Sequence, residues 1–194
     1  MKKILYIHGL GGGANSRTPR ILKEYLDRKE YEVVNPELPV DPRKGFLQAV
    51  FEVLTYKPDL VIASSLGGFY ALRINGPWKT LVINPAMGSD DDIKVIGLGT
   101  YEFNSTRADG LKSFEIDEDF LKKLDDLRTA HIENQDPNRV YGVFGTNDEL
   151  FSHIEDFRRD YKEENMKILL GEKHSLSEEA IINKVIPLVK ELLK

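Results

Sequence analysis

The chain has 194 residues, of which 41% are hydrophobic and 30% are charged. This composition predicts one globular domain that needs neither a disulfide nor a metal to hold its core. A net charge of −5 argues against nucleic acid or a membrane surface as the partner. The absence of cysteine excludes disulfides, thiolate metal sites and a cysteine nucleophile.

The N-terminus begins with a short apolar run, ILYI at residues 4–7, which stops at His8-Gly9. A secretory signal needs an apolar stretch of about 7–15 residues, and a membrane span needs about 18 or more. We therefore expect a buried first strand and a cytoplasmic protein.

Short apolar runs alternate with longer amphipathic runs along most of the chain. In chain order they predict a strand over 2–9, a helix over 16–29, a strand over 31–39, a helix over 42–56, a strand over 59–64, a helix over 67–74, strands over 79–86 and 139–145, a helix over 151–162, a strand over 166–172 and a helix over 177–193. The helix over 42–56 carries one apolar stripe, formed by Phe46, Leu47, Val50, Phe51 and Leu54.

Several of these strands are apolar throughout, as is typical of a sheet covered by helices on both faces. The repeated strand–helix order indicates parallel pairing through right-handed crossovers. We therefore predict an α/β protein, a single domain over 1–194 with one doubly wound, mostly parallel sheet of about six strands. Ligands bind such sheets at the carboxyl ends of the strands, so the residues that follow each strand are candidates for a site.

Residues 86–138 break the alternation, with a loop that carries Asp90-Asp91-Asp92 and one predicted helix near 117–133. We expect this segment to be a short cap-like insertion before the last two strands rather than a second domain. The three aspartates indicate a solvated acidic loop rather than a cation site, because no histidine accompanies them.

An apolar strand leads into the segment ASSLG at residues 63–67. A serine on a tight strand-to-helix turn is held in strained backbone geometry, which leaves no room for large side chains two positions away. For Ser65 those positions are Ala63 and Gly67, both small, whereas for Ser64 both are bulky. We therefore predict that Ser65 is a nucleophile and that Ser64 is its structural neighbour. The alternative for Ser65 is a helix N-cap.

A serine hydroxyl needs a base to take its proton, and the base needs an acid to fix its tautomer. His174 follows the last predicted strand and Asp148 follows the one before it, so both are expected at the carboxyl edge of the sheet. We predict that His174 is the base and Asp148 the acid. Glu149 is the nearest rival for the acid, and Asp148 has the N-cap of the next helix as its alternative role.

Attack on an ester carbonyl places negative charge on oxygen, which backbone amides must stabilise. The amide of Leu66 is at a helix N-terminus, and the amide of Leu10 is in the glycine-rich loop after the first strand. We predict that these two amides form an oxyanion hole. His8 is expected to brace the loop, and Gly9 allows the backbone to approach the substrate closely.

The motifs His8-Gly9-Leu10, Ser64–Gly68, Asn84-Pro85-Ala86, Asn147-Asp148-Glu149 and Lys173-His174-Ser175 occur in this order. With them the chain resembles a small α/β-hydrolase, and more narrowly the compact YqiA-like esterases. The resemblance covers nearly the whole chain. It implies a Ser-His-Asp triad, no cofactor, and hydrolysis of carboxylic esters. The residues themselves give no reason to expect a metal. The chain departs from many members by an alanine at the first position of the serine turn.

The expected substrate is a small-molecule ester, with thioesters and amides as further candidates because they use the same machinery. The insertion is short for a large lid, so we expect an open site and short acyl chains. Met87, Leu98, Tyr101 and Phe103 are candidates to line it, with the protein core as their alternative place.

Two other functions remain open from the sequence. The glycine-rich loop at residues 9–14, with Glu37 in the next strand as a ribose partner, fits a dinucleotide-binding fingerprint loosely. That reading leaves Ser65, Asp148 and His174 unexplained. The other alternative is a hydrolase-fold protein that binds a partner or small molecule and has lost or changed its activity.

Overall fold

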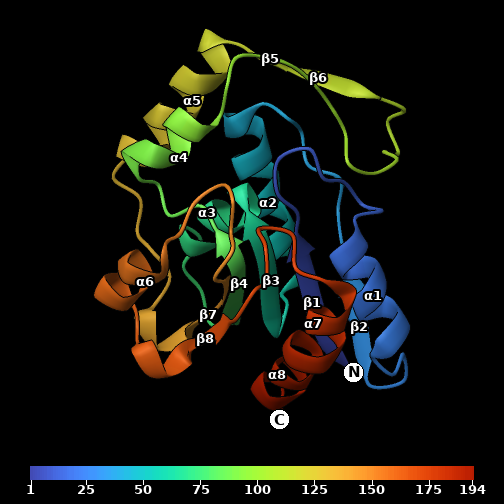
Figure 1. Ribbon diagram of the computed structural model, residues 1–194. Coiled ribbons are helices and arrows are strands. Elements are labelled where there is room, and N and C mark those ends of the chain that lie inside the picture. Colours follow the sequence, from blue (N-terminus) through green and yellow to red (C-terminus); the bar gives the residue numbers. More distant parts are fainter.

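Six parallel strands form the central sheet of the computed structural model, which describes residues 1–194 (Figure 1). Their order across the sheet is β2-β1-β3-β4-β7-β8, and every neighbouring pair is parallel. The strands are β1 (Lys2–Ile7), β2 (Tyr31–Val34), β3 (Leu60–Ser65), β4 (Lys79–Pro85), β7 (Val140–Gly145) and β8 (Met166–Leu169). The predicted fold class is therefore confirmed.

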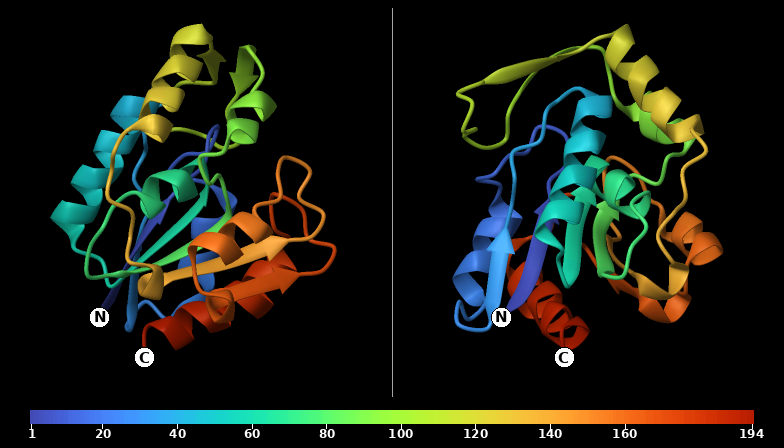
Figure 2. Two further views of the ribbon diagram at one scale, coloured as in Figure 1. Left: turned by 90° about the vertical axis from the view of Figure 1, so that its left-hand side faces the viewer. Right: turned by 180° about the vertical axis from the view of Figure 1, so that it is seen from behind.

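Helices cover both faces of the sheet, and each face has its own buried core (Figure 2). Ile4 and Tyr6 of β1 belong to one core cluster, Leu5 and Ile7 to the other, and none of the four is more than 2% exposed. Burial on both faces explains why the strands are apolar throughout. One face is covered by α1 (Arg17–Tyr25) and the C-terminal helix, the other by α2 (Pro42–Tyr56) and α3 (Leu66–Leu72).

The remaining helical segments outside the insertion lie after residue 136. The C-terminal helix is one continuous run made of α7 (Glu178–Ala180), the π-helical turn η3 (Ile181–Val185) and α8 (Ile186–Leu192). The 3-10 turn η1 (Pro137–Arg139) precedes β7, and α6 (Ile154–Asp160) and the 3-10 turn η2 (Glu163–Asn165) connect β7 to β8. None of the helices combines the length and the apolar character that crossing a membrane requires.

The chain switches direction across the sheet at β1, because β2 lies on one side of it and β3 on the other. Ligands in open α/β sheets bind at such a switch point, outside the carboxyl ends of the strands. Ile7, the last residue of β1, pairs with Ala63 near the end of β3. The loop after β1 and the turn at Ser65 are therefore brought together by the topology.

Residues 86–138, called the insertion from here on, carry the helices and the hairpin that lie above the carboxyl ends of the strands (Figure 1), and their last residues return to the opposite edge of the sheet, where the Gln135 side chain donates to the Trp78 carbonyl at 3.3 Å. They contain α4 (Asp90–Val95), an antiparallel hairpin of β5 (Gly99–Glu102) and β6 (Ser113–Ile116), and α5 (Glu118–Thr129). The sequence predicted only the last of these elements, at 117–133. The hairpin has no two-residue turn signal, because ten residues separate its strands.

The acidic run at the start of the insertion is a helix N-terminus and not a solvated loop. Asp92 is 4% exposed, and its Oδ2 accepts hydrogen bonds from the backbone amides of Met87, Gly88 and Ser89. The Ser89 hydroxyl in turn accepts from the Asp92 amide at 3.2 Å, which completes a capping box. The expected solvated loop is therefore corrected for Asp92.

A buried histidine links the insertion to α6. His153, 4% exposed, hydrogen-bonds Asp156 at the start of α6 through Nδ1 at 2.7 Å and Asp92 of α4 through Nε2. Burial alone would lower the pKa of His153, but the hydrogen bonds to the two carboxylates outweigh it and raise the pKa above the ordinary value. The two contacts link α4 to α6, and both favour the protonated imidazole over the neutral one.

We expect His153→Gln to destabilise the protein by an amount that shrinks as the pH rises. Because the folded-state pKa is raised, the stabilisation by charged His153 is complete below about pH 6.5 and is lost as the pH rises through the folded-state pKa. Urea unfolding of both proteins between about pH 6 and pH 9 measures this difference. A difference that stays constant or grows with pH would contradict a charged His153.

Candidate active site

Ser65 sits in a backbone conformation that few non-glycine residues adopt. Its φ is 52°, at the junction where β3 ends and α3 begins, and the register with β4 shifts between Ser64 and Ser65. Such strain persists only where the surroundings enforce it. A side chain at Gly67 would overlap the carbonyl oxygens of Ile7 and His8, so this position must be glycine for the turn to pack against β1. Ala63, the departure from the family pattern, fits in a fully buried position.

The two adjacent serines have different surroundings. The Ser64 hydroxyl is hydrogen-bonded to the Tyr6 hydroxyl at 2.8 Å, and burial raises the pKa of Tyr6, which keeps that phenol protonated. The Ser65 hydroxyl has no hydrogen-bond partner in the protein and lines the main cavity. Gly9 lies opposite it, where an added Cβ would be 2.8 Å from the Ser65 Cβ.

His174 and Asp148 are in direct contact. Nδ1 of His174 and Oδ2 of Asp148 are 2.9 Å apart, and the side chains are 14% and 3% exposed, respectively. The other oxygen of Asp148 accepts hydrogen bonds from the amides of Leu150 and Phe151, at 2.9 and 3.2 Å. One oxygen of Asp148 thus organises the loop after β7, while the other contacts the imidazole. Nε2 of His174 remains free, and His174 and Ser65 line the same cavity without a hydrogen bond between them.

Glu149 has a different place from its neighbour Asp148. Its carboxylate accepts a hydrogen bond from the backbone amide of His174 at 3.1 Å, and this bond lowers the pKa of Glu149. Glu149 therefore fixes the backbone of the loop after β8, residues 170–177, which is called the histidine loop from here on. Glu149 forms no hydrogen bond with the imidazole ring.

Asn84, near the end of β4, fixes the histidine loop through hydrogen bonds to its backbone, a role that the sequence analysis missed. Its Nδ2 donates to the carbonyl oxygens of Lys173 and His174 at 2.9 and 2.8 Å, and its Oδ1 accepts from the Gly145 amide at 2.8 Å. Asn84 is 2% exposed and has a φ of 41°, a conformation that asparagine tolerates better than most residues. Its place in an Asn-Pro-Ala motif directly after an apolar strand was the available signal.

The loop after β1 is arranged around His8. The His8 Nε2 accepts a hydrogen bond from the Leu38 amide at 3.1 Å, and Nδ1 donates to the Gly9 carbonyl at 2.9 Å. Burial lowers the pKa of His8, which favours the neutral ring that this pattern requires. Because C=O and N–H point in opposite directions across a trans peptide, the bonded Gly9 carbonyl turns the Leu10 amide the other way. That amide has no acceptor in the protein.

The Leu66 amide, the second predicted oxyanion donor, belongs to the first residue of α3. The first amides of a helix have no intrahelical acceptor. Leu66 directly follows Ser65, and both Leu10 and Leu66 line the cavity.

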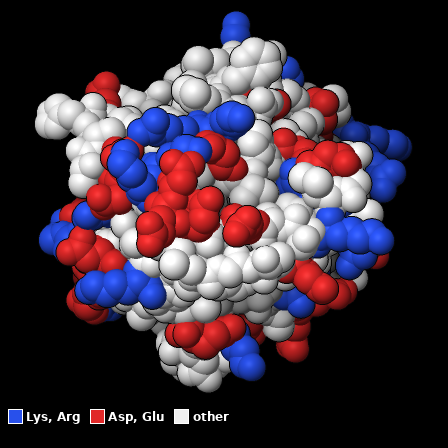
Figure 3. All heavy atoms as spheres, turned by 90° about the horizontal axis from the view of Figure 1, so that it is seen from above, with Lys and Arg blue, Asp and Glu red and all other residues white.

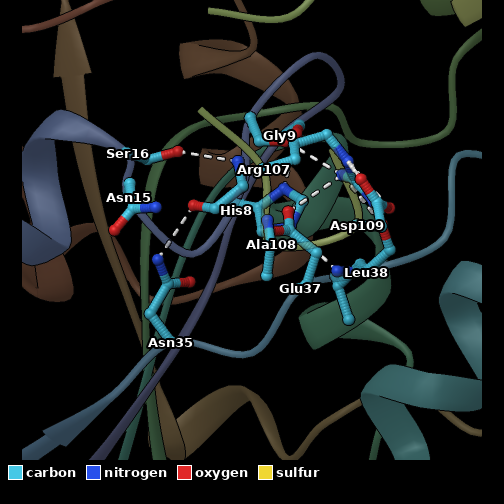
Figure 4. A network of polar contacts seen from close by, with 12 residues as sticks. His8, Gly9, Asn15, Ser16, Asn35, Glu37, Leu38, Arg107, Ala108 and Asp109 are labelled. Carbon is cyan, nitrogen blue, oxygen red and sulfur yellow. Dashed lines mark hydrogen bonds and ion pairs between the residues drawn. The ribbon is translucent and has the colours of Figure 1, made fainter. Parts of the chain in front are cut away.

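A buried arginine and its ion pairs lie beside the loop after β1 (Figure 4). Arg107 of the insertion, with a 3% exposed side chain, contacts Glu37 at 2.9 Å and Asp109 at 2.6 Å, and donates to the Leu38 carbonyl at 3.2 Å. Glu37 is thus engaged with Arg107 and does not line the cavity, which removes the ribose partner that the nucleotide-binding alternative needs.

The cavity between the sheet and the insertion has a volume of about 680 Å³. Of the four candidate lining residues, Tyr101 lines it and the other three lie elsewhere. Met87 packs with the core cluster around Phe144, Leu98 is 58% exposed, and the Phe103 ring lies 4.5 Å from the Arg107 guanidinium. The lining from the insertion comes instead from α4 and the hairpin, through residues such as Ile93, Ile96, Phe114 and Ile116.

The structure contains no group of three or more His, Asp or Glu side chains arranged to hold a metal ion.

Several solved structures share this architecture. Mouse alpha/beta hydrolase domain-containing protein 10 superposes with a TM-score of 0.68 at 16% identity, covering 98% of this chain and 89% of the other. Est1E from Butyrivibrio proteoclasticus gives 0.67 at 17% identity, covering 99% and 88%. The ydeN gene product of B. subtilis gives 0.65 at 13% identity, covering 100% and 99%. At these identities the likeness establishes the α/β-hydrolase fold.

No curated protein matches the chain. The model of the uncharacterised protein family UPF0227 matches residues 3–190, nearly the whole chain. With an α/β-hydrolase fold and this match along its length, the chain belongs to the family UPF0227.

Proposed function

We propose that the protein is a serine hydrolase that cleaves small carboxylic esters through an acyl-enzyme intermediate. The observation that carries the proposal is the coincidence of three features at one cavity. These are the strained, unpartnered Ser65, the His174–Asp148 hydrogen bond of 2.9 Å and a free Nε2 on the same imidazole. Each alone has a structural explanation, but their presence at one cavity supports the roles of nucleophile, base and acid.

In the first step the Ser65 hydroxyl attacks the ester carbonyl while Nε2 of His174 accepts its proton. Asp148 holds the Nδ1–H tautomer and stabilises the imidazolium. The amides of Leu10 and Leu66 donate to the developing oxyanion, and the N-terminus of α3 adds a favourable dipole. His174 then protonates the leaving alcohol, and afterwards the same imidazole activates the water that hydrolyses the acyl-enzyme.

A catalytically altered hydrolase-fold protein that only binds a partner is the remaining alternative. The support for catalysis is that the loops bearing Ser65 and His174 are held by several independent hydrogen bonds and close contacts. A purely binding role gives no reason for the strained φ of Ser65. Metagenome-derived lipolytic enzymes among the proteins of similar fold are consistent with the proposal.

We expect Ser65→Ala to abolish both nitrophenyl-ester hydrolysis and labelling by a fluorophosphonate probe, because the attacking oxygen is removed. Ser64→Ala should keep both within about tenfold, since the Ser64 hydroxyl is hydrogen-bonded to Tyr6 and not to His174. Steady-state kinetics and mass spectrometry of the labelled protein measure the two effects. Equal labelling of the two variants would show that Ser65 is not the nucleophile.

We expect Asn84→Asp to reduce kcat by about a hundredfold with a much smaller change in KM. The aspartate keeps an acceptor for Gly145 but replaces the donor to the Lys173 and His174 carbonyls by a repelling oxygen, which displaces the imidazole. Steady-state kinetics on a short-chain nitrophenyl ester separate kcat from KM.

Asn165→Asp is the matched control for Asn84→Asp. Asn165 also donates to a backbone carbonyl, that of Val140 at 3.0 Å, but lines no part of the cavity. It should lower stability while leaving kcat near the wild-type value. Equal losses of kcat in the two variants, in proportion to their loss of stability, would argue that Asn84 is structural only.

A further inference from the structure

The two walls of the cavity differ in chemistry. The wall made by β1, the start of α1, the end of β3 and the histidine loop is rich in hydroxyls and carries one guanidinium. Its polar side chains are Tyr6, Ser16, Arg17, Thr18, Ser64 and Ser175. The opposite wall, made by α3 and the insertion, is mainly apolar, with Phe69, Ile93, Ile96, Phe114, Ile116 and Leu124. Ser65 and His174 line the same cavity.

Two hydrogen bonds, one to a side chain and one to a backbone carbonyl, hold Arg17 beside the residues that follow His174. Its Nη2 donates to the Ser175 hydroxyl at 3.0 Å and to the Leu176 carbonyl, so the guanidinium lies against the residues that directly follow His174. Its Nη1 and Nε groups form no hydrogen bond with the protein, and no carboxylate pairs with it. A positioned guanidinium with free donors is suited to bind a carboxylate in a planar, charge-assisted contact.

The other charged residues that line the cavity differ from Arg17. Asp92 is bonded to His153, and Arg128 pairs with Asp90 and Asp125 at 2.8 and 2.7 Å. Glu102 lines the cavity from β5 of the insertion. No acidic side chain therefore lines the hydroxyl-rich wall.

The outer surface above the strands carries Lys and Arg side chains as well as Asp and Glu side chains (Figure 3). A surface of mixed sign gives no uniform field that would select a charged substrate. Selection by charge then depends on individual groups inside the cavity.

We propose that the esters cleaved at this site carry a carboxylate, which Arg17 binds, and an apolar portion that lies under the insertion. This inference rests on the proposed ester hydrolysis and specifies its substrate class. The Arg17 guanidinium contacts the anion and the hydroxyls of Ser16 and Thr18 complete a polar surface around it. The carboxylate thereby orients the ester carbonyl over Ser65.

The test compares matched substrate pairs. One pair is a nitrophenyl hemiester of a short dicarboxylic acid and the nitrophenyl ester of the monocarboxylic acid of equal chain length. The other pair is the acetyl esters of a carboxyphenol and of the corresponding uncharged phenol. The first pair places the anion on the acyl half of the ester and the second pair places it on the alcohol half. Comparing the two pairs therefore identifies which half of the ester faces Arg17.

For at least one pair we expect wild-type kcat/KM to favour the anionic ester by about tenfold or more. Arg17→Gln should remove most of that preference while changing the rate on the neutral ester far less, and Arg17→Lys should retain part of it. Arg20→Gln is the matched control, because Arg20 is an exposed arginine of the same helix, as Arg17 is, but does not line the cavity. It should keep the wild-type preference.

The preference of the wild-type enzyme should also fall as salt is added, which tests the charge contact without any variant. A wild-type enzyme that cleaves the neutral esters with no preference for either anionic one overturns the inference and leaves the proposed hydrolysis standing. A preference that Arg17→Gln leaves intact also overturns it, as does an equal loss on both esters, which would mean that Arg17 acts only by bracing the histidine loop. Failure to cleave any ester would defeat the proposed function and this inference together.

Discussion

The close contact between the carboxyl ends of β1 and β3 is the constraint on which the site depends. Ser65 holds a φ of 52° because the turn that carries it packs directly on the backbone of Ile7 and His8, a contact that only glycine at position 67 permits. The same contact places Gly9 opposite the Ser65 side chain. A single feature of the topology, the switch between β1 and β3, thus brings the serine and the glycine-rich loop together.

The other half of the site is positioned by several polar contacts, together with the packing of the Phe151 ring on the His174 ring at 5.0 Å. The histidine loop is held from three directions, by the Asn84 amide, by the Glu149 carboxylate and by the Asp148–His174 contact. Asn84 also bonds Gly145 at the end of β7, so the ends of two strands and the loop after β8 form one unit. Fixed donors and acceptors of this kind allow a site to keep its geometry without reorganising during a reaction.

Features with a local cause could be predicted from the sequence. The alternation of apolar runs and helices predicted the parallel sheet, because both depend on hydrophobic periodicity along the chain. The choice of Ser65 over Ser64 depended only on the sizes of neighbouring residues, and the structure gives Ser65 the strained backbone. Its role as nucleophile remains a prediction.

Features that depend on distant contacts could not be predicted. The sequence predicted one apolar stripe along α2, yet three of its members, Leu47, Phe51 and Leu54, are between 58% and 64% exposed. The buried face has small residues such as Gly45 and Ala49, because a Cβ at position 45 would come within 2.8 Å of the Pro39 carbonyl oxygen. The roles of Asn84, Asp92 and Arg107 likewise arise only when segments far apart in sequence meet.

The central claim is that Ser65, His174 and Asp148 act as one catalytic unit at the rim of the sheet. A crystal structure of the protein after reaction with a small alkyl fluorophosphonate tests it most directly. The account predicts phosphorus bonded to Ser65 Oγ, its free oxygen within hydrogen-bond distance of the Leu10 and Leu66 amides, and His174 bonded to Asp148. An adduct on another residue, or a His174 ring turned away from the adduct and from Asp148, would contradict it.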